Sequence, residues 1–229
     1  HGKTTFVNAL LGAPLLPMGV TPTTAVIHHV AHGETQTAKA VGDAGEKDVA
    51  IGELEQYEVG GAAQADAVKH LDVKYPAPFL EEGVVLVDTP GLVGDVTAAD
   101  EADDARDSPT RRNLKLQARE AYELALSKAK QRSAILLCID DHNDWGLASA
   151  ARRLCADADP TLARTVVVNT KLDTKLVQFS GARDIMRFLR AGVLGDLHPR
   201  LLAGPFFTSV PCGRVASPIS SSGDTYDRK

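Results

Sequence analysis

Apolar and polar residues follow one another along this chain in patterns that predict strands and helices in alternation. Residues 84–87 and 134–139 are short apolar runs, rich in β-branched side chains, of the kind buried on both faces in a parallel sheet. Further strands are expected at 25–30, 164–168 and 205–210. Because the carboxyl edge of an open α/β sheet is where ligands bind, the residues that follow each strand are the ones to inspect for chemistry.

Apolar residues at helical spacing predict the elements that cover this sheet. The expected helices are residues 6–11, closed by Gly12, and residues 111–132, 145–156 and 181–194. Strands and helices in this order predict an α/β fold with a mostly parallel sheet flanked by helices.

One long segment between strands has little pattern of its own. Residues 31–68 are polar and rich in Ala and Gly, so we expect an insertion, with a helix around Ala62–His70. Residues 71–75 alternate in polarity and predict a half-exposed strand, which we expect to pair antiparallel with residues 84–87. Residues 217–229 are rich in Ser, Gly and Asp and are expected to be a disordered tail.

The composition narrows the classes of protein. The 229 residues are 44% hydrophobic, enough for one α/β domain with a proper core. A net charge of −5 gives no electrostatic case for a nucleic-acid partner. The three cysteines fit no zinc or disulfide spacing and indicate a reducing compartment.

The first candidate chemistry lies at the start of the helix at 6–11. Gly2, Lys3 and Thr4 match the last three positions of the phosphate-binding loop G-x-x-x-x-G-K-[ST], and we expect the chain to begin inside this motif. Backbone N–H groups as far as Thr5 would then cradle phosphates. Lys3 would bridge the β and γ phosphates, and the Thr4 hydroxyl would bind Mg²⁺. The alternative is an exposed Lys-Thr pair at an ordinary helix start.

A threonine follows about twenty residues later, in a Pro- and Gly-punctuated loop before the strand at 25–30. Thr24 stands where nucleotide switches place their first sensor, and it would give its hydroxyl to Mg²⁺ and help to hold the attacking water. Thr23 is the weaker candidate, and a strand-capping threonine is the alternative. His28 and His29 point to opposite faces of this strand, cannot chelate one metal together, and are interpreted as structural.

The strand at 84–87 ends in Asp88-Thr-Pro-Gly91. A carboxylate beside a backbone N–H with no side chain suits a Mg²⁺-bound phosphate, with Asp88 on the metal side and Gly91 on the phosphate side. The alternative is an ordinary Pro-Gly turn.

The strand at 164–168 delivers Asn169-Thr170-Lys171-Leu172-Asp173. Guanine carries two adjacent donors, N1–H and the 2-amino group, and the carboxylate of Asp173 can accept both, whereas adenine offers no such pair. The stem of Lys171 would pack along the base plane, and Thr170 belongs to the same motif. Backbone groups from Ser209 to Gly213 are weaker candidates for closing over the base. The alternative is a charged turn after a strand.

Taken together, NALLG, LLPMGVTPTTAVI, VDTPGL and NTKLD resemble the dynamin superfamily of large GTPases. From 111 to 215, AILLCIDDHNDW, RTVVVNTKLDTKLVQFS and GPFFTSVPCGRV resemble the plastid-division dynamin-related proteins of plants and algae. Residues 22–26 depart from that group and are more similar to bacterial dynamin-like proteins or mitofusins.

The resemblance implies a P-loop GTPase domain over residues 1–216, with dynamin-type insertions and lacking its first strand and the first half of its P-loop. It implies Mg²⁺-dependent GTP hydrolysis, self-association through GTPase domains, and a cytoplasmic protein recruited to an organelle membrane, first of all the plastid outer envelope. The alternatives are a nucleotide-gated scaffold with little hydrolysis and a membrane-fusion GTPase.

Overall fold

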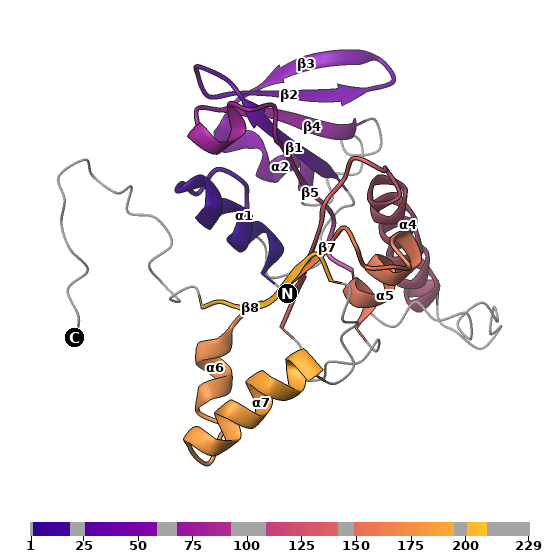
Figure 1. Ribbon diagram of the computed structural model, residues 1–229. Helices are drawn as coiled ribbons and strands as arrows, with labels where there is room; N and C mark the ends of the chain where they lie inside the picture. Colours follow the sequence, from indigo (N-terminus) through magenta and orange to yellow (C-terminus); the bar gives the residue numbers. More distant parts are fainter. Residues whose placement is uncertain are drawn as a thin grey trace.

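The computed structural model describes residues 2–18, 26–58, 68–92, 109–141, 149–194 and 201–209. These residues form the α/β fold with flanking helices that the sequence predicts (Figure 1). The strands are divided between two sheets, however, and the larger sheet is mixed rather than mostly parallel. Predictions for residues 19–25, 62–67 and 210–229, which include Thr24 and the tail, fall outside the described residues.

The larger sheet has five strands in the order β3-β2-β4-β1-β5. Their bounds are β1 Ile27–His32, β2 Thr37–Gly42, β3 Gly45–Val49, β4 Val68–Tyr75 and β5 Val85–Asp88. β1 runs parallel to β4, with His29 opposite Asp72 in register, and antiparallel to β5, with His28 opposite Asp88. β2 pairs antiparallel with both β3 and β4.

The smaller sheet is parallel throughout, in the order β6-β7-β8. Its strands are β6 Leu136–Asp140, β7 Thr165–Asn169 and β8 Ala203–Phe207. All three strands were predicted. β6 ends at Asp140, which Asp141 follows, and β7 ends at Asn169, where the segment Thr170–Asp173 begins.

Helices cover both sheets. Their bounds are α1 Lys3–Leu11, α2 Glu55–Glu58, α4 Pro109–Ala129, α5 Ala150–Ala158, α6 Leu172–Leu176 and α7 Ala182–Leu194, with short 3₁₀ turns at Ile51–Glu53 and Pro78–Leu80. No helix in the described part of the chain has the length and apolar character needed to cross a membrane.

Two hydrophobic cores hold the fold together. In the first, Val7 and Leu11 of α1 pack on the face of the large sheet that carries Val30, Leu71 and Val73. In the second, α4 and α5 pack on β6 and β7, where the buried side chains include Tyr122, Leu126, Cys138, Leu154 and Val167. Leu92, just after the Asp-Thr-Pro-Gly turn, packs against the second core, so this turn passes from one core to the other.

Three expectations about the large sheet are wrong. β5 is not buried on both faces: it pairs only with β1 among the described strands, and Val85 and Val87 are 50% and 42% exposed. β4 does not pair with β5, because β1 lies between them and runs parallel to β4. Val68–His70 belong to β4 rather than to a helix. The insertion at 31–68, in which the sequence shows little pattern, also contains the β2–β3 hairpin.

Candidate nucleotide site

Gly2, which directly precedes α1, has a backbone conformation that glycine adopts more easily than any residue with a side chain. Gly2 has φ 80°, in the left-handed region that L residues avoid, and its carbonyl accepts the Phe6 N–H at 2.9 Å. The next residues, Lys3, Thr4 and Thr5, form the first turn of the helix, where backbone N–H groups have no partner within the helix and are free for an anion.

The second residue of α1 joins this helix to the end of β5. The Thr4 hydroxyl donates to Asp88 Oδ2 at 2.7 Å, and Asp88 is buried. Two residues 84 positions apart, which the sequence assigns to one metal, therefore lie in direct contact. Hydroxyl and carboxylate oxygens are ligands that suit Mg²⁺, so this pair fits the ion that the motifs imply.

Lys3 lies close enough to Asp88 for their charges to interact. Burial lowers the pKa of Lys3, and the negative charge of Asp88 partly restores it. Burial raises the pKa of Asp88, while the hydrogen bond from Thr4 and the charge of Lys3 act in the opposite direction. Burial thus disfavours the charged form of each group, and a phosphate beside Lys3 or a cation beside Asp88 would stabilise these charged forms.

His28, which the sequence suggests is a structural residue, is a further neighbour of Asp88. It stands opposite Asp88 in the β1–β5 pairing and is buried. Burial, and then the charge of His29, lowers the pKa of His28 to about 4, so at neutral pH it adds no charge next to Asp88. Only the pairing register, which the sequence does not show, reveals this proximity.

The segment after β7 comes back to the start of α1. A side-chain carbon at Gly2 would lie 3.8 Å from the Thr170 hydroxyl, so the GKT and TKLD motifs are adjacent. Thr170 is buried and is held by Asp140: its N–H donates to the Asp140 carbonyl at 2.7 Å and its hydroxyl to the same oxygen at 3.2 Å. The end of β6 thereby fixes the residue that precedes Lys171.

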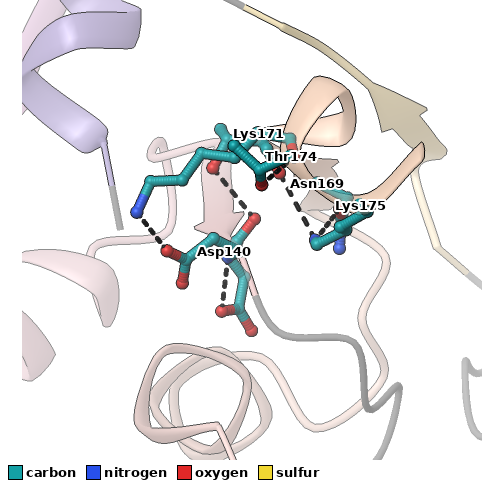
Figure 2. A network of polar contacts seen from close by, with 7 residues as sticks. Asp140, Asn169, Lys171, Thr174 and Lys175 are labelled. Carbon is teal, nitrogen blue, oxygen red and sulfur yellow. Dashed lines mark hydrogen bonds and ion pairs between the residues drawn. The ribbon is translucent and has the colours of Figure 1, made fainter. Parts of the chain in front are cut away.

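Lys171 has the unusual backbone angle φ 56°, which ends β7 and starts α6. Its ammonium pairs with the carboxylate of Asp141, and its carbonyl accepts the Thr174 hydroxyl at 2.8 Å (Figure 2). Below it, the buried Lys175 donates to Asn169 Oδ1 at 2.5 Å. Side chains on both sides of the turn therefore hold the Lys171 backbone in a conformation that costs energy for a residue with a side chain.

The loop after β8 lies beside this turn. The Asp173 N–H donates to the Ser209 hydroxyl at 2.9 Å, and the Leu172 N–H donates to the Thr208 carbonyl at 3.2 Å. Asp173 is exposed, so its carboxylate is free to meet a ligand from solution. The structure thus brings the weaker candidate Ser209 next to the stronger candidate Asp173.

The remaining predicted residues differ in what surrounds them. Thr5 contacts the Met18 sulfur at 3.6 Å on the surface rather than Asp88. Gly91 is exposed with open space around it, as a backbone approach to phosphate requires. Asp140 and Asp141 are not among the predicted site residues, yet they hold Thr170 and Lys171. Their signal was present: an acidic pair directly after a buried strand.

Comparisons with known proteins agree with these motifs. The family model described as "Dynamin family" matches residues 1–172. Dynamin-like protein ARC5 of Arabidopsis thaliana is 38% identical over 139 residues, which make up 58% of this chain and 16% of that protein. A bacterial dynamin-like protein of Nostoc punctiforme is 30% identical over 105 residues, 40% of this chain and 15% of that protein. The chain thus spans about a sixth of the length of these two relatives.

Solved structures give the same fold. Two structures of an oligomerised bacterial dynamin pair, described as providing a mechanism for the long-range sensing and tethering of membranes, match with TM-scores of 0.53 and 0.51. The identities are 15% and 16%, and each match covers 91% of this chain and 28% of the matched chain. Likeness at this level of identity concerns the fold.

Proposed function

Because this chain belongs to the dynamin family, whose members are GTPases, we propose that it binds GTP and hydrolyses its γ-phosphate. The observation that carries the proposal is the convergence of three motifs distant in sequence. Thr4 contacts Asp88, and Gly2 lies beside Thr170, so the phosphate motif stands between the metal-side carboxylate and the guanine motif. One nucleotide could reach all three.

At the phosphate end, the backbone from Gly2 to Thr5 and the Lys3 ammonium would bind the β and γ phosphates, with Gly91 donating its N–H to the γ-phosphate. Thr4, Asp88 and Thr24 would hold Mg²⁺, which when bound neutralises charge on the phosphate oxygens. Lys3 would stabilise the charge that develops as water attacks phosphorus and the β–γ bridging bond breaks. Thr24 would help to orient that water.

At the base end, the Asp173 carboxylate would accept from guanine N1–H and the 2-amino group, while the stem of Lys171 covers the base plane. Asp141 pairs with the Lys171 ammonium and would hold this side chain in place for that contact. Ser209, bound to the Asp173 N–H, would close the site from the β8 side. Thr170 would line the path between base and phosphates.

The relatives support a proposal for the cellular role. The 38% identity to the Arabidopsis dynamin-like protein and the resemblance of residues 111–215 to plastid-division proteins favour remodelling of the plastid outer envelope. In this proposal the protein is cytoplasmic, associates with itself through its GTPase domains, and reaches the membrane through other parts of the whole protein.

The test is phosphate release by the full-length protein, with GTP and with ATP, with and without Mg²⁺, over a range of protein concentrations. Mg²⁺-dependent GTP turnover that rises per molecule with concentration supports a GTPase stimulated by self-association. GTP binding without turnover would instead favour the nucleotide-gated scaffold.

Two variants and a control assign the site. Lys3→Ala should lower turnover by at least about 10²–10³-fold, the effect of losing one stabilising donor. Asp173→Asn should lose preference for GTP over ATP, because each hydrogen bond to a charged acceptor contributes about 1.5–3 kcal/mol, or roughly 10- to 100-fold in affinity. Asp43→Asn changes an exposed surface carboxylate that pairs with Lys69, and should leave both properties unchanged. Wild-type selectivity in Asp173→Asn would refute the base assignment.

A further inference from the structure

The two central strands of the large sheet carry an unusual polar group on the face opposite the first core. His29 on β1 is in register with Asp72 on β4, and His70 lies two residues before Asp72, so all three side chains share one face. The other face of the same strands carries Val30, Leu71 and Val73, which are buried in the core. This face of the two strands therefore brings two imidazoles and a carboxylate together at partly exposed positions.

The distances among these side chains approach those of a metal site. Asp72 Oδ1 lies 3.1 Å from His29 Nδ1 and 3.5 Å from His70 Nε2, and the three ligand atoms all lie within 4.8 Å of one another. Ligands on a tetrahedral ion with bonds of about 2.0–2.1 Å are about 3.3 Å apart. Small side-chain rotations on two hydrogen-bonded strands would therefore bring all three to one ion.

We propose that His29, His70 and Asp72 bind a divalent first-row transition ion, with Zn²⁺ as the foremost candidate. Two imidazole nitrogens and one carboxylate oxygen form a donor set typical of Zn²⁺ and its neighbours, whereas Mg²⁺ prefers oxygen ligands alone. The site is therefore chemically distinct from the one at Thr4 and Asp88. All three side chains are partly exposed, so an ion can reach them and a water molecule can complete the coordination.

Asp72 has a second neighbour across the sheet besides His29. On the other side of Asp72, Lys39 is the register neighbour from β2, and its ammonium donates to Glu46 at 2.9 Å, so part of its positive charge is balanced.

The ammonium of Lys128 on α4 should weaken metal binding at this site, and this effect can be tested. Its ammonium lies 3.4 Å from His29 Nε2. A metal on Nδ1 leaves the proton of neutral imidazole on Nε2, where it would face the ammonium donor instead of an acceptor. Replacing Lys128 by Gln supplies a carbonyl oxygen that can accept this N–H, and groups that support a ligating histidine are worth about 10–100-fold in affinity. Lys128→Gln should therefore tighten metal binding about tenfold or more.

The experiment is titration of tag-free, nucleotide-free full-length protein with Zn²⁺ in competition with a chromogenic chelator, and with Co²⁺ followed by visible absorption. His70→Gln should weaken Zn²⁺ binding by more than about 100-fold, since a lost ligand exceeds a lost supporting group. Asp72→Asn keeps an acceptor for the His29 ring but not the anionic ligand, and should also weaken binding. His32→Gln, on the same strand but the opposite face, is the matched control.

Site-dependent binding of one ion per chain, with tetrahedral Co²⁺ absorption that His70→Gln abolishes and His32→Gln preserves, supports the proposal. Circular dichroism establishes that the variants are folded. Two results would overturn it: absence of binding by the folded wild-type protein, or equal affinity in His70→Gln and His32→Gln, which would place the ion elsewhere on the protein.

Discussion

Asn8 of α1 clamps the backbone that leaves this helix, and its removal should loosen that segment. Its side-chain amide donates to the Leu16 carbonyl at 2.8 Å, and its Oδ1 accepts the Leu16 N–H at 2.9 Å. Asn8 is 2% exposed and Leu16 is equally buried. In Asn8→Ala both backbone groups of Leu16 lose their partner where water does not replace it easily.

The magnitude follows from the two unpaired groups. Each buried donor or acceptor left unsatisfied costs about 1–3 kcal/mol, so Asn8→Ala should lower the free energy of unfolding by about 2–6 kcal/mol. That is a large part of the roughly 5–15 kcal/mol that stabilises a typical domain. Even the lower limit corresponds to about a 30-fold increase in the population of open states, if the loss is felt at Leu16.

Hydrogen exchange measures this directly. We expect protection of the Leu16 amide to fall at least about 30-fold in Asn8→Ala. Leu10→Ala, at a half-exposed position of the same helix, is the control for a general weakening of α1. Unchanged Leu16 protection in a folded Asn8→Ala protein would refute the assignment of this stability to the clamp.

Three further predictions concern other parts of the fold. Burial would raise the pKa of Asp159, but hydrogen bonds from the Arg164 N–H and two threonine hydroxyls hold this pKa below the ordinary 3.8. The stabilisation from these bonds is therefore present above pH 3.8 and is lost as the pH falls through the folded-state pKa. Urea melts of the wild-type protein and Asp159→Asn should differ at pH 7 and converge in acid. Leu71→Ala, at a fully buried position of a central strand, should cost about 2–5 kcal/mol in the same melts. Arg152→Met should cost about 3–5 kcal/mol because it removes an ionic partner of the buried Asp140, and adding Asp140→Asn should recover part of the loss.

Local chemistry explains what the sequence predicted well. The first turn of α1, the strand into Asn169 and the turn at Thr170–Asp173 are each defined by residues within a few positions, such as Gly2 at the helix start. The helical spacing of residues 111–132 and 181–194 likewise appears as α4 and α7. These elements depend on backbone angles and amphipathic faces, which the neighbouring residues determine.

The sequence did not allow us to predict which strands pair with one another or in which register. Apolar character at 84–87 suggested burial, yet β5 pairs with β1 alone among the described strands and leaves Val85 and Val87 exposed. The β2–β3 hairpin escaped notice because its inward positions are the small Ala38 and Ala40, with Val49 at the end, and these give a weak alternation. Register likewise decides that His28 faces Asp88 and that His29 faces Asp72, and nothing local records either choice.

In the candidate site, too, some features can be recognised from the sequence and others cannot. Thr170, Lys171 and Asp173 are recognisable by side-chain chemistry, but the bonds that position their backbone come from the Asp140 and Thr208 carbonyls and from the Ser209 hydroxyl. Any residue supplies a carbonyl, so the two carbonyl supports leave no trace in the sequence, whereas Ser209 was a candidate by its position after the last strand. Substitutions at Asp140 or Thr208 that keep the backbone in place should therefore spare base selectivity, whereas changes that shift the ends of β6 or β8 should weaken it even with Asp173 intact. Selectivity for GTP over ATP, measured beside the stability of each variant, separates these two cases.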